Sequence, residues 1–280
     1  MTFAVIVTFN PEMELLKQQY QALKNQVDGI IYVDNKSETI NIANLIESND
    51  CIILNNEKNV GLAKAQNRGI RKAQEMSAEY VVLFDQDSIP PSNFVSSLTK
   101  CYFKYCCNGR VGLVGPAIRN LLTGSKYNEK GEIFTGLFKR RVEITDKTKV
   151  SYCIASGSFI PLSVIEDVGF MEEKLFIDGL DIEWCLRAIS KGYEIIQTNQ
   201  TYLAHCLGDG TDKRVESHSP IREYYIMRNS TWMIKRAYIP IGYRLRKVFT
   251  AFGRFCLSLK SFNMAYVKAD IYGFYDGIKL

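Results

Sequence analysis

Several features that define other classes of protein are absent from this sequence of 280 residues. No apolar run approaches the roughly 18 residues that a membrane-spanning helix needs. The eight cysteines form no Cys-x-x-Cys pair, which disfavours a zinc site and indicates reduced, mostly buried thiols. The N-terminal residues lack the basic segment of a signal peptide, so we expect them to form a strand. These absences favour a cytoplasmic globular protein.

Acidic residues are missing from one long segment. Between Glu223 and Asp270 there is no Asp or Glu, whereas nine Lys and Arg residues fall there, so the basic character of the chain belongs to its tail. A basic amphipathic helix of this kind can lie on an anionic membrane surface, pack on the rest of its own chain or pack on a second subunit. An oligomer is therefore one possibility. No nucleic-acid-binding motif accompanies the charge, so we expect no nucleic-acid partner. Apolar residues recur there at helical spacing, namely Ile241, Leu245, Val248, Phe252, Phe255, Leu259 and Phe262.

Short apolar runs alternate with helical segments over the first hundred residues. This rhythm predicts an α/β fold with a mostly parallel central sheet flanked by helices. After residue 84 the alternation is less regular. The polar segment 119–149 predicts either a long loop outside the sheet or a small hairpin. The expected strands are 4–9, 30–34, 51–55, 80–84, 111–118, 150–160, 193–197 and 201–206. The expected helices are 11–26, 38–48, 62–76, 92–107, 178–191, 222–236 and 241–262.

Two acids end the fourth expected strand, in Phe84-Asp85-Gln86-Asp87-Ser88. The carboxyl edge of a parallel sheet is where open α/β sheets bind ligands, and carboxylates there suit a hard divalent cation that bridges to phosphates. Thr8, Phe9 and Asn10 end the first strand, and Asp34 ends the second, so we expect all of them along this same edge. They can frame a nucleoside, or they can be ordinary turn and cap residues.

Three further segments carry candidate groups. Gly61 begins a helix where backbone N–H groups could approach an anion, although the sequence has no Gly-x-Gly-x-x-Gly or Walker loop. On the helix expected at 178–191, Asp178 and Asp181 share a face, as a general base or as acids that complement the helix dipole. His205 ends a short strand, either as a metal or phosphate contact or as a core histidine.

Taken in order, these segments resemble the inverting glycosyltransferases of family 2, which have the GT-A fold. The resemblance covers residues 1 to about 235. The form of the Asp85–Asp87 motif and the segment 176–187 look most like bacterial rhamnosyltransferases of O-antigen and other surface polysaccharide synthesis. The motifs that carry it are Thr8-Phe9-Asn10, Val33-Asp34-Asn35, Asn59 to Gly69, Phe84 to Ser88, Ser156-Gly157 and Asp181-x-Glu183-x-Cys185-Leu186-Arg187.

The resemblance implies transfer of a sugar, with inversion, from a nucleotide-sugar donor to a saccharide hydroxyl. Leu180 stands where the family usually has the first acid of a Glu-Asp pair, which leaves Asp181 as the expected base and Asp178 as a less favoured substitute. Mg²⁺ or Mn²⁺ is the implied cofactor, with Asp87, Asp85 and His205 as its ligands. The implied donor-binding residues are Thr8, Phe9, Asn10, Asp34, Asn35, Gly61, Asn67, Asp85, Gln86, Asp87, Ser156, Gly157, His205 and Arg228. The implied acceptor-binding residues are Asp178, Glu183 and Trp184, with Trp184 offering a ring face to a sugar or lying in the core.

The implied organisation is a catalytic domain over 1–235 and a basic helical tail over 236–280. The domain would divide into a nucleotide-binding half at 1–118 and an acceptor-binding half at 119–235. The favoured donor is dTDP-L-rhamnose, and the acceptor is a saccharide that a polyprenyl lipid can carry, which would place the enzyme on the inner face of the cytoplasmic membrane. A UDP-sugar transferase, a nucleotidyltransferase and a non-catalytic nucleotide-sugar-binding module are the alternatives.

Overall fold

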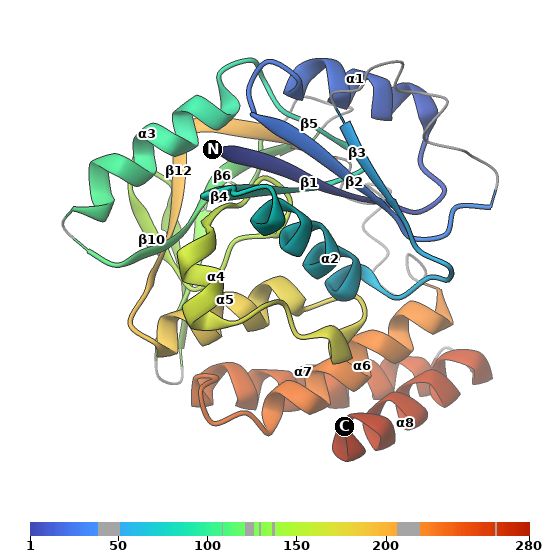
Figure 1. The fold of residues 1–280 in the computed structure, drawn as a ribbon. Helices are drawn as coiled ribbons and strands as arrows, with labels where there is room; N and C mark the ends of the chain where they lie inside the picture. Colours follow the sequence, from blue (N-terminus) through green and yellow to red (C-terminus); the bar gives the residue numbers. More distant parts are fainter. Residues whose placement is uncertain are drawn as a thin grey trace.

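The computed structural model shows a central sheet with helices on both faces and three further helices at one side (Figure 1). It describes residues 1–38, 51–107, 109–120, 126–128, 130–135, 138–205, 219–260 and 262–280. The expected α/β fold with a C-terminal helical extension is confirmed. The helix expected at 38–48 lies almost wholly outside the described residues.

The first half of the sheet is parallel, as its alternating strands and helices predict. Strand β1 pairs with β2 on one side and with β4 on the other, and β2 pairs with β3. The predicted positions are correct to within about three residues at each end. The elements are β1 (Thr2–Thr8), α1 (Met13–Leu23), β2 (Gly29–Asp34), β3 (Cys51–Asn55), α2 (Leu62–Glu75) and β4 (Tyr80–Asp85).

The second half of the sheet mixes directions. Beyond β4 the order is β11, β6, β12 and β10, with β6 and β12 parallel and β11 antiparallel to both of its neighbours. Strand β5 adds to β12, and β7 adds to β6. The elements are β5 (Ser88–Ile89), α3 (Phe94–Cys106), β6 (Val111–Asn120), β7 (Lys126–Asn128), β10 (Thr148–Val150), β11 (Phe159–Pro161), α4 (Leu162–Val168), the 3₁₀ helix η2 (Glu173–Leu175), α5 (Leu180–Ser190) and β12 (Glu194–His205).

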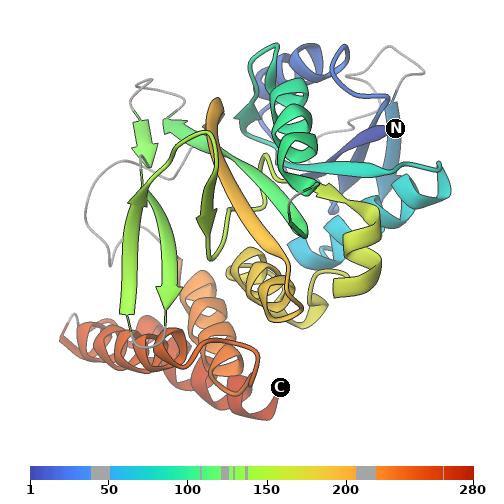
Figure 2. The same ribbon diagram turned by 90° about the vertical axis from the view of Figure 1, so that its left-hand side faces the viewer.

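Two predictions in this half need correction, and one helix was missed. The strand expected at 150–160 is two short strands, because 151–158 leaves the sheet and passes beside the end of β4. The two strands expected at 193–206 are one strand, β12, with a register shift between Thr198 and Tyr202. The short helix α4 was not predicted. Of the two possibilities for 119–149, the hairpin is present as β8 (Lys130–Thr135) and β9 (Phe138–Glu143), which extends toward the C-terminal helices (Figure 2).

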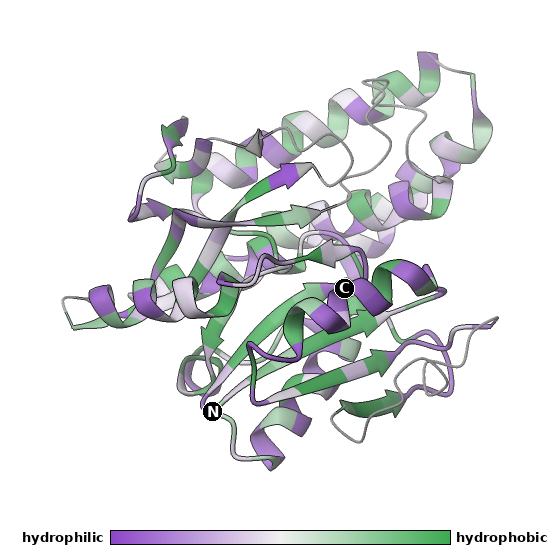
Figure 3. Cartoon of the chain, turned by 90° about the horizontal axis from the view of Figure 1, so that it is seen from above, coloured by the Kyte–Doolittle hydropathy of each residue, from purple (hydrophilic) through white to green (hydrophobic). Residues whose placement is uncertain are grey.

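The core lies in two layers because successive strand residues point to opposite faces of the sheet. Val5 and Val33 pack with α2, α4 and α5, whereas Ala4, Ile6 and Tyr32 pack with α1 and α3. The central strands are buried on both faces, and Figure 3 shows them as largely hydrophobic. Nearly continuous apolar runs of this kind are typical of parallel sheets covered on both sides.

Three helices follow the sheet: α6 (Pro220–Ile234), α7 (Ile241–Lys260) and α8 (Met264–Lys279). Helix α8, which was not predicted as a separate helix, packs closely on α6. A Cβ at Gly273 would lie 2.6 Å from the carbonyl of Tyr224, and one at Gly277 would lie 2.4 Å from that of Arg228. No helix in the described part of the chain is both long and apolar enough to cross a bilayer.

Helix α7 turns most of its apolar stripe outward. Phe252 is 68% exposed and Phe249 is 73% exposed, whereas the buried side of the helix carries Gly242, Tyr243 and Ser258. Its Arg254 pairs with Glu223 of α6 instead of lying free at the surface. Packing on the other described residues therefore does not account for the apolar stripe of α7.

Candidate active site

The strand ends predicted to share one edge of the sheet do so. In the parallel ladders Thr8 pairs with Asp34, and Asp34 pairs with Asn55. On the other side of β1, Val7 pairs with Asp85. The polar residues that follow the first, second and fourth expected strands therefore meet at the carboxyl edge of the sheet.

Asp34 anchors the two loops beside β1 and β2. Its Oδ1 accepts from Thr8 Oγ1 at 3.1 Å and from Ser37 Oγ at 2.5 Å, and its Oδ2 accepts from the Ser37 N–H at 3.0 Å. The N–H of Asn10 donates to Ser37 Oγ, and its side-chain oxygen accepts from the N–H of Glu38, both at 2.9 Å. This network fixes the backbone that was expected to frame a nucleoside.

The loop of Asp85 and Asp87 is held from behind by two side chains. The N–H of Asp85 donates to Ser156 Oγ at 3.0 Å, and that oxygen lies 2.7 Å from Ser88 Oγ. Gln19 Nε2 donates to the carbonyls of both Asp85 and Ser88 at 2.7 Å. Gln19 was not predicted, and its one signal in the sequence is an amide on the otherwise apolar buried face of α1. Ser156 therefore holds the acidic loop in position through the N–H of Asp85 and the hydroxyl of Ser88.

Gln86 connects this loop to the end of β1. Its Oε1 accepts from the N–H of Phe9 at 2.8 Å, and its Nε2 donates to the carbonyl of Phe9 at 3.3 Å. The Phe9 ring is 45% exposed beside this contact. Gly157 adopts φ 81°, and its N–H donates to the carbonyl of Leu83 at 2.7 Å. The Gln86 side chain thus links the acidic loop to the backbone of Phe9, and the Gly157 backbone links segment 151–158 to β4.

The acids of this loop fit a divalent cation that arrives with a diphosphate. Within the described ranges, no three His, Cys, Asp or Glu side chains gather as a metal-binding group. Asp85 and Asp87 offer carboxylate oxygens at a partly exposed position, and a hard cation completes its shell with waters and substrate phosphates. The backbone of His205 pairs with Ser88 in the sheet, which places the end of β12 beside this loop. The His205 side chain lies outside the described part of the chain.

The start of α2 is not the anion site that Gly61 suggested. The N–H groups of Leu62 and Ala63 already donate to the carbonyl of Phe176, at 2.6 and 3.4 Å. Gly61 has φ 86°, and a Cβ there would lie 2.5 Å from the Phe176 ring. The glycine permits close packing of α2 against the loop before α5, so the donor-binding prediction for Gly61 is corrected.

Asn35 and Asn67 hold neighbouring loops in place. The Asn35 amide donates to Asn59 Oδ1 and accepts from the N–H of Val60, each at 2.9 Å. The Asn67 amide makes two hydrogen bonds of 2.9 Å to the backbone of Met171. Both asparagines are buried with their polar groups paired inside the protein, so their predicted contact with the donor is corrected to a positioning role.

Helix α6 fixes the loop that precedes α5. Asn229, which is buried, has its Nδ2 within 2.8, 2.6 and 2.8 Å of the carbonyl oxygens of Leu175, Ile177 and Asp178. Arg222 forms a bidentate pair with the Asp178 carboxylate, at 3.1 and 2.9 Å. Asp178 has φ 64° and precedes the helix, so it does not share a helical face with the base candidate as predicted.

Arg228 also supports this loop and does not extend toward a diphosphate. Its guanidinium donates to the carbonyls of Lys174 and Leu175 at 2.6 and 2.9 Å and lies 4.7 Å from the centre of the Tyr225 ring. The donor-binding prediction for Arg228 is therefore corrected as well. The sequence did not predict that Arg222 and Asn229 hold this loop, because their partners lie more than 40 residues away in the chain.

Asp181 lies in the first turn of α5, half-buried, with Oδ1 accepting from the N–H of Ile182 at 2.8 Å. Burial, together with the nearby carboxylates of Asp85 and Asp178, raises the pKa of its carboxyl to about 6 against the lowering effect of that N–H. A carboxylate with such a pKa is deprotonated at neutral pH and still basic enough to accept a proton. The charge of Asp85 thus acts on the carboxyl of Asp181.

The other acceptor-binding candidates on α5 lie in the interior. Glu183 is 1% exposed and forms an ion pair of 2.8 Å with Arg187, and it also accepts from the Tyr238 hydroxyl. Trp184 is equally buried, with its Nε1 donating to the carbonyl of Gly169 at 2.8 Å. The prediction that Glu183 contacts the acceptor is corrected, and of the two alternatives for Trp184 the core position is found.

Known proteins are similar to this chain in sequence and in fold. The chain is 31% identical to the dTDP-rhamnosyl transferase RfbF of Shigella flexneri, over 99% of this chain and 95% of that protein. Two solved structures share its fold. The 1–349 fragment of TarS from S. aureus aligns over 100% of this chain and 80% of its own, with a TM-score of 0.66 and 16% identity. GalNAc-T7, solved with UDP, GalNAc and Mn²⁺, aligns over 94% of this chain and 57% of its own, with a TM-score of 0.62 and 14% identity.

The family match covers more of the chain than the strand ends described above. The model of glycosyl transferase family 2 matches residues 3–169, which is more than half of the chain and includes the Asp34 and Asp85–Asp87 segments. The match ends before α5, and the full-length relative covers the remainder. This protein therefore belongs to glycosyl transferase family 2 and is a glycosyltransferase.

Proposed function

We propose that the protein transfers L-rhamnose from dTDP-L-rhamnose to a hydroxyl group of a saccharide acceptor, with inversion at the anomeric carbon. The choice of donor is supported by the dTDP-rhamnosyl transferase to which the chain is similar over nearly its whole length. Residues 1–118 carry the nucleotide-binding edge, and 119–235 form the acceptor-binding half. The tail, 236–280, follows them.

One observation carries the mechanism: the half-buried carboxylate of Asp181 lies near Asp85 with its pKa raised to about 6. The acceptor oxygen forms a bond to the anomeric carbon as the bond from that carbon to the diphosphate breaks. The hydroxyl proton passes to Asp181, and the nucleoside diphosphate leaves with the electron pair. Asp87 and Asp85 would hold Mg²⁺ or Mn²⁺, which as a Lewis acid offsets the charge that builds on the leaving group.

Asp181→Asn tests the base. Removal of a general base costs about 10²- to 10⁴-fold in rate, so we expect transfer to fall by at least 100-fold. Donor binding, measured by calorimetry with Mn²⁺ present, should change by less than threefold. Asp146→Asn, at an exposed ion pair with Lys104, is the matched control and should keep normal transfer. Near-normal turnover by Asp181→Asn would exclude this base.

A screen of nucleotide sugars tests the donor. We expect metal-dependent binding and slow hydrolysis of dTDP-L-rhamnose, with weaker binding of UDP-glucose and UDP-N-acetylglucosamine. Loss of binding in EDTA would agree with the assignment of Asp87 and Asp85. A preference for a UDP-sugar would replace the donor and leave the assignment of the base intact.

We propose that the acceptor is lipid-linked and that the exposed face of α7 lies on the cytoplasmic surface of the membrane. The exposed side chains that support this proposal are apolar and aromatic, and such side chains favour the interface between lipid headgroups and acyl chains. A second subunit on the same face is the competing arrangement.

A further inference from the structure

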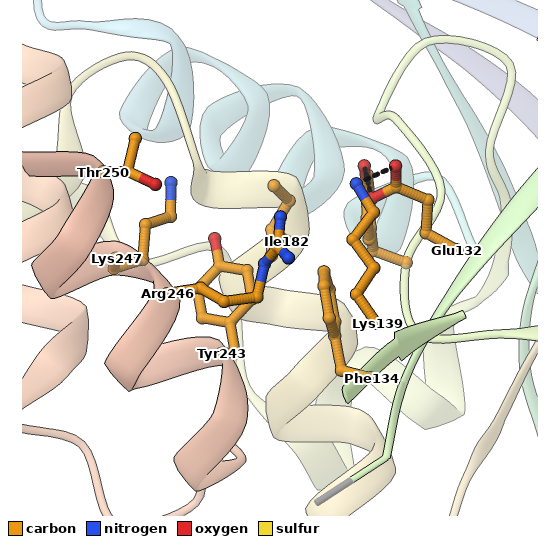
Figure 4. Close-up of a pocket in the computed structure, with 9 residues that line it drawn as sticks. Glu132, Phe134, Lys139, Ile182, Tyr243, Arg246, Lys247 and Thr250 are labelled. Carbon is orange, nitrogen blue, oxygen red and sulfur yellow. Dashed lines mark hydrogen bonds and ion pairs between the residues drawn. The ribbon is translucent and has the colours of Figure 1, made fainter. Parts of the chain in front are cut away.

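A pocket opens between the β8–β9 hairpin and α7, beside the N-terminal turn of α5 (Figure 4). Its volume is about 170 Å³, so it is a small site that is partly open to solvent. None of the donor-edge residues lines it. The lining residues are Glu132, Phe134, Lys139, Tyr152, Ile182, Tyr243, Arg246, Lys247 and Thr250.

The pocket carries an excess of positive charge. Glu132 is compensated from within, because Lys139 forms an ion pair with it and the Tyr152 hydroxyl donates to it at 3.0 Å. Arg246 and Lys247 form no ion pair with any described residue. Burial lowers the pKa of Lys247 and the charge of Arg254 lowers it further, against the opposite effect of Asp181 and Asp178. An anion in the pocket would stabilise the charged form of Lys247 against both its burial and the repulsion by Arg254.

A buried hydroxyl group also lacks a partner here. Tyr243 is 4% exposed, and its Oη has no hydrogen-bond partner among the described residues. Its ring packs edge-on against Phe134 with centroids 4.8 Å apart, and Figure 4 shows the hydroxyl directed toward the space between Arg246 and Lys247. A buried polar group without a partner costs about 1–3 kcal/mol. A ligand oxygen in the pocket would satisfy it.

The pocket adjoins the proposed base. Ile182, which follows Asp181 in α5, lines the pocket, and the charge of Asp181 acts on both Tyr243 and Lys247. A molecule bound here therefore contacts the turn of α5 that carries the proposed base. The ring faces of Phe134 and Tyr152, stacked 6.0 Å apart, add an apolar wall suited to a sugar.

We propose that this pocket binds a phosphate or diphosphate group carried by the saccharide acceptor, through Arg246, Lys247 and the Tyr243 hydroxyl. This inference rests on the proposed glycosyl transfer and names the chemical class of its acceptor. An arginine matches two phosphate oxygens at once, and a lysine adds a compact positive charge. The phosphate group can belong to a lipid-linked saccharide diphosphate or to a soluble sugar phosphate.

Inorganic pyrophosphate is the probe. Calorimetric titration in EDTA avoids metal-dependent binding at the acidic loop. We expect saturable binding to the unmodified protein, and at least tenfold weaker binding to the double variant Arg246→Ala/Lys247→Ala. Lys260→Ala/Lys268→Ala removes two exposed positive charges elsewhere on the C-terminal helices and should bind as the unmodified protein does. Equal binding by both double variants would overturn the proposal.

Two further measurements separate the outcomes. Tyr243→Phe should weaken pyrophosphate binding while keeping or raising the melting temperature, because it removes an unpaired buried hydroxyl. Binding of dTDP with Mn²⁺ should be unchanged in all variants, and its loss in Arg246→Ala/Lys247→Ala would assign the pocket to the donor instead.

Acceptor preference identifies the source of the phosphate group. Transfer to a saccharide bearing a diphospho-undecyl chain, but not to the sugar 1-phosphate, would identify a lipid-linked acceptor, and the reverse would identify a soluble one. A preference for the unphosphorylated saccharide would refute the proposal. Failure of the proposed function would appear differently, as absence of donor binding and hydrolysis while pyrophosphate still binds.

Discussion

Asp181 and Glu183 are two residues apart on α5, and their surroundings give them different chemistry. Glu183 is buried against Arg187 and Tyr238, so its charge is neutralised within the protein. Asp181 forms no such pair: burial raises its pKa, and the nearby carboxylates of Asp85 and Asp178 act in the same direction. The helix turns one acid into the core and leaves the other at the site, which explains why only one of them can act as a base.

The pKa of Asp181 predicts the pH dependence of catalysis. The proposed base must be deprotonated, so kcat/KM should fall about tenfold per pH unit below a pH of about 6 and reach a plateau above it. Initial rates at low acceptor concentration, measured from acid to neutral pH, check this limb. Rates that stay constant through the acid range would show that another group takes the proton.

Some site residues are predictable from the sequence and others are not. Asp34 and Asp85 end apolar runs in a parallel sheet, so strand register alone brings them together. Gln19 and Asn229 act through contacts with segments 50 or more residues away, and no local pattern reports such contacts. Gly61 misled the prediction because a glycine that permits close packing resembles one that admits a phosphate.

At the scale of elements, α6 holds in place the loop that precedes α5 and its proposed base, Asp181. It holds the segment 174–178 by the Asn229 amide, the Arg228 guanidinium and the pair between Arg222 and Asp178. Phe176 and Asp178 adopt φ values of 63° and 64°, which cost energy in residues other than glycine. The interactions from α6 offset this cost and keep Asp181 in its position.

Asn229→Ala should therefore impair catalysis more than folding. We expect the loss of its hydrogen bonds to cost about 1–3 kcal/mol of stability and to lower kcat by at least tenfold with donor affinity unchanged. Asn263→Ala removes the N-cap of α8 and costs about 1 kcal/mol, so it is a stability control that should keep full activity. Equal activity of the two variants at the same folded fraction would contradict the supporting role of α6.

Among elements, the sequence predicts those whose own residues form the pattern. Strands β1 to β4 are runs of apolar residues and were located closely. Segment 151–158 has apolar residues only at 152–155, and it leaves the sheet to place Ser156 behind Asp85. Helix α8 carries Gly273 and Gly277, which weaken a helical pattern. They are present because α6 approaches the backbone of α8 too closely for side chains.

At the scale of the molecule, the sheet joins a parallel nucleotide-binding edge to a mixed half that carries the hairpin and the pocket. The acidic loop and Asp181 lie where the two halves meet. Helix α7 contributes to both the pocket and the outer surface, since Tyr243 faces inward and Phe249 faces outward. A membrane under α7 would bring a lipid-linked acceptor to the pocket side of the protein.

The double variant Phe249→Ser/Phe252→Ser tests this orientation. The unmodified protein should float with liposomes containing anionic lipid, and the variant should lose most of that binding because burial of a phenylalanine contributes roughly 1.5–3 kcal/mol. Phe138→Ser, which changes a similarly exposed ring on β9, should float normally. If the double variant instead abolishes a dimer seen by sedimentation and flotation is absent throughout, the face belongs to a second subunit.

The raised pKa of Asp181 also has a consequence for the stability of the folded chain. Its pKa is about 6 in the folded chain and near 3.8 in an unfolded one, so the folded chain holds the proton more tightly. This group therefore adds to the free energy of unfolding in acid, and the contribution is lost as pH rises through about 4 to 6. The protonation that favours folding at this residue is therefore the one that removes the proposed base, so the contribution of Asp181 to stability and its role in catalysis have opposite pH dependences.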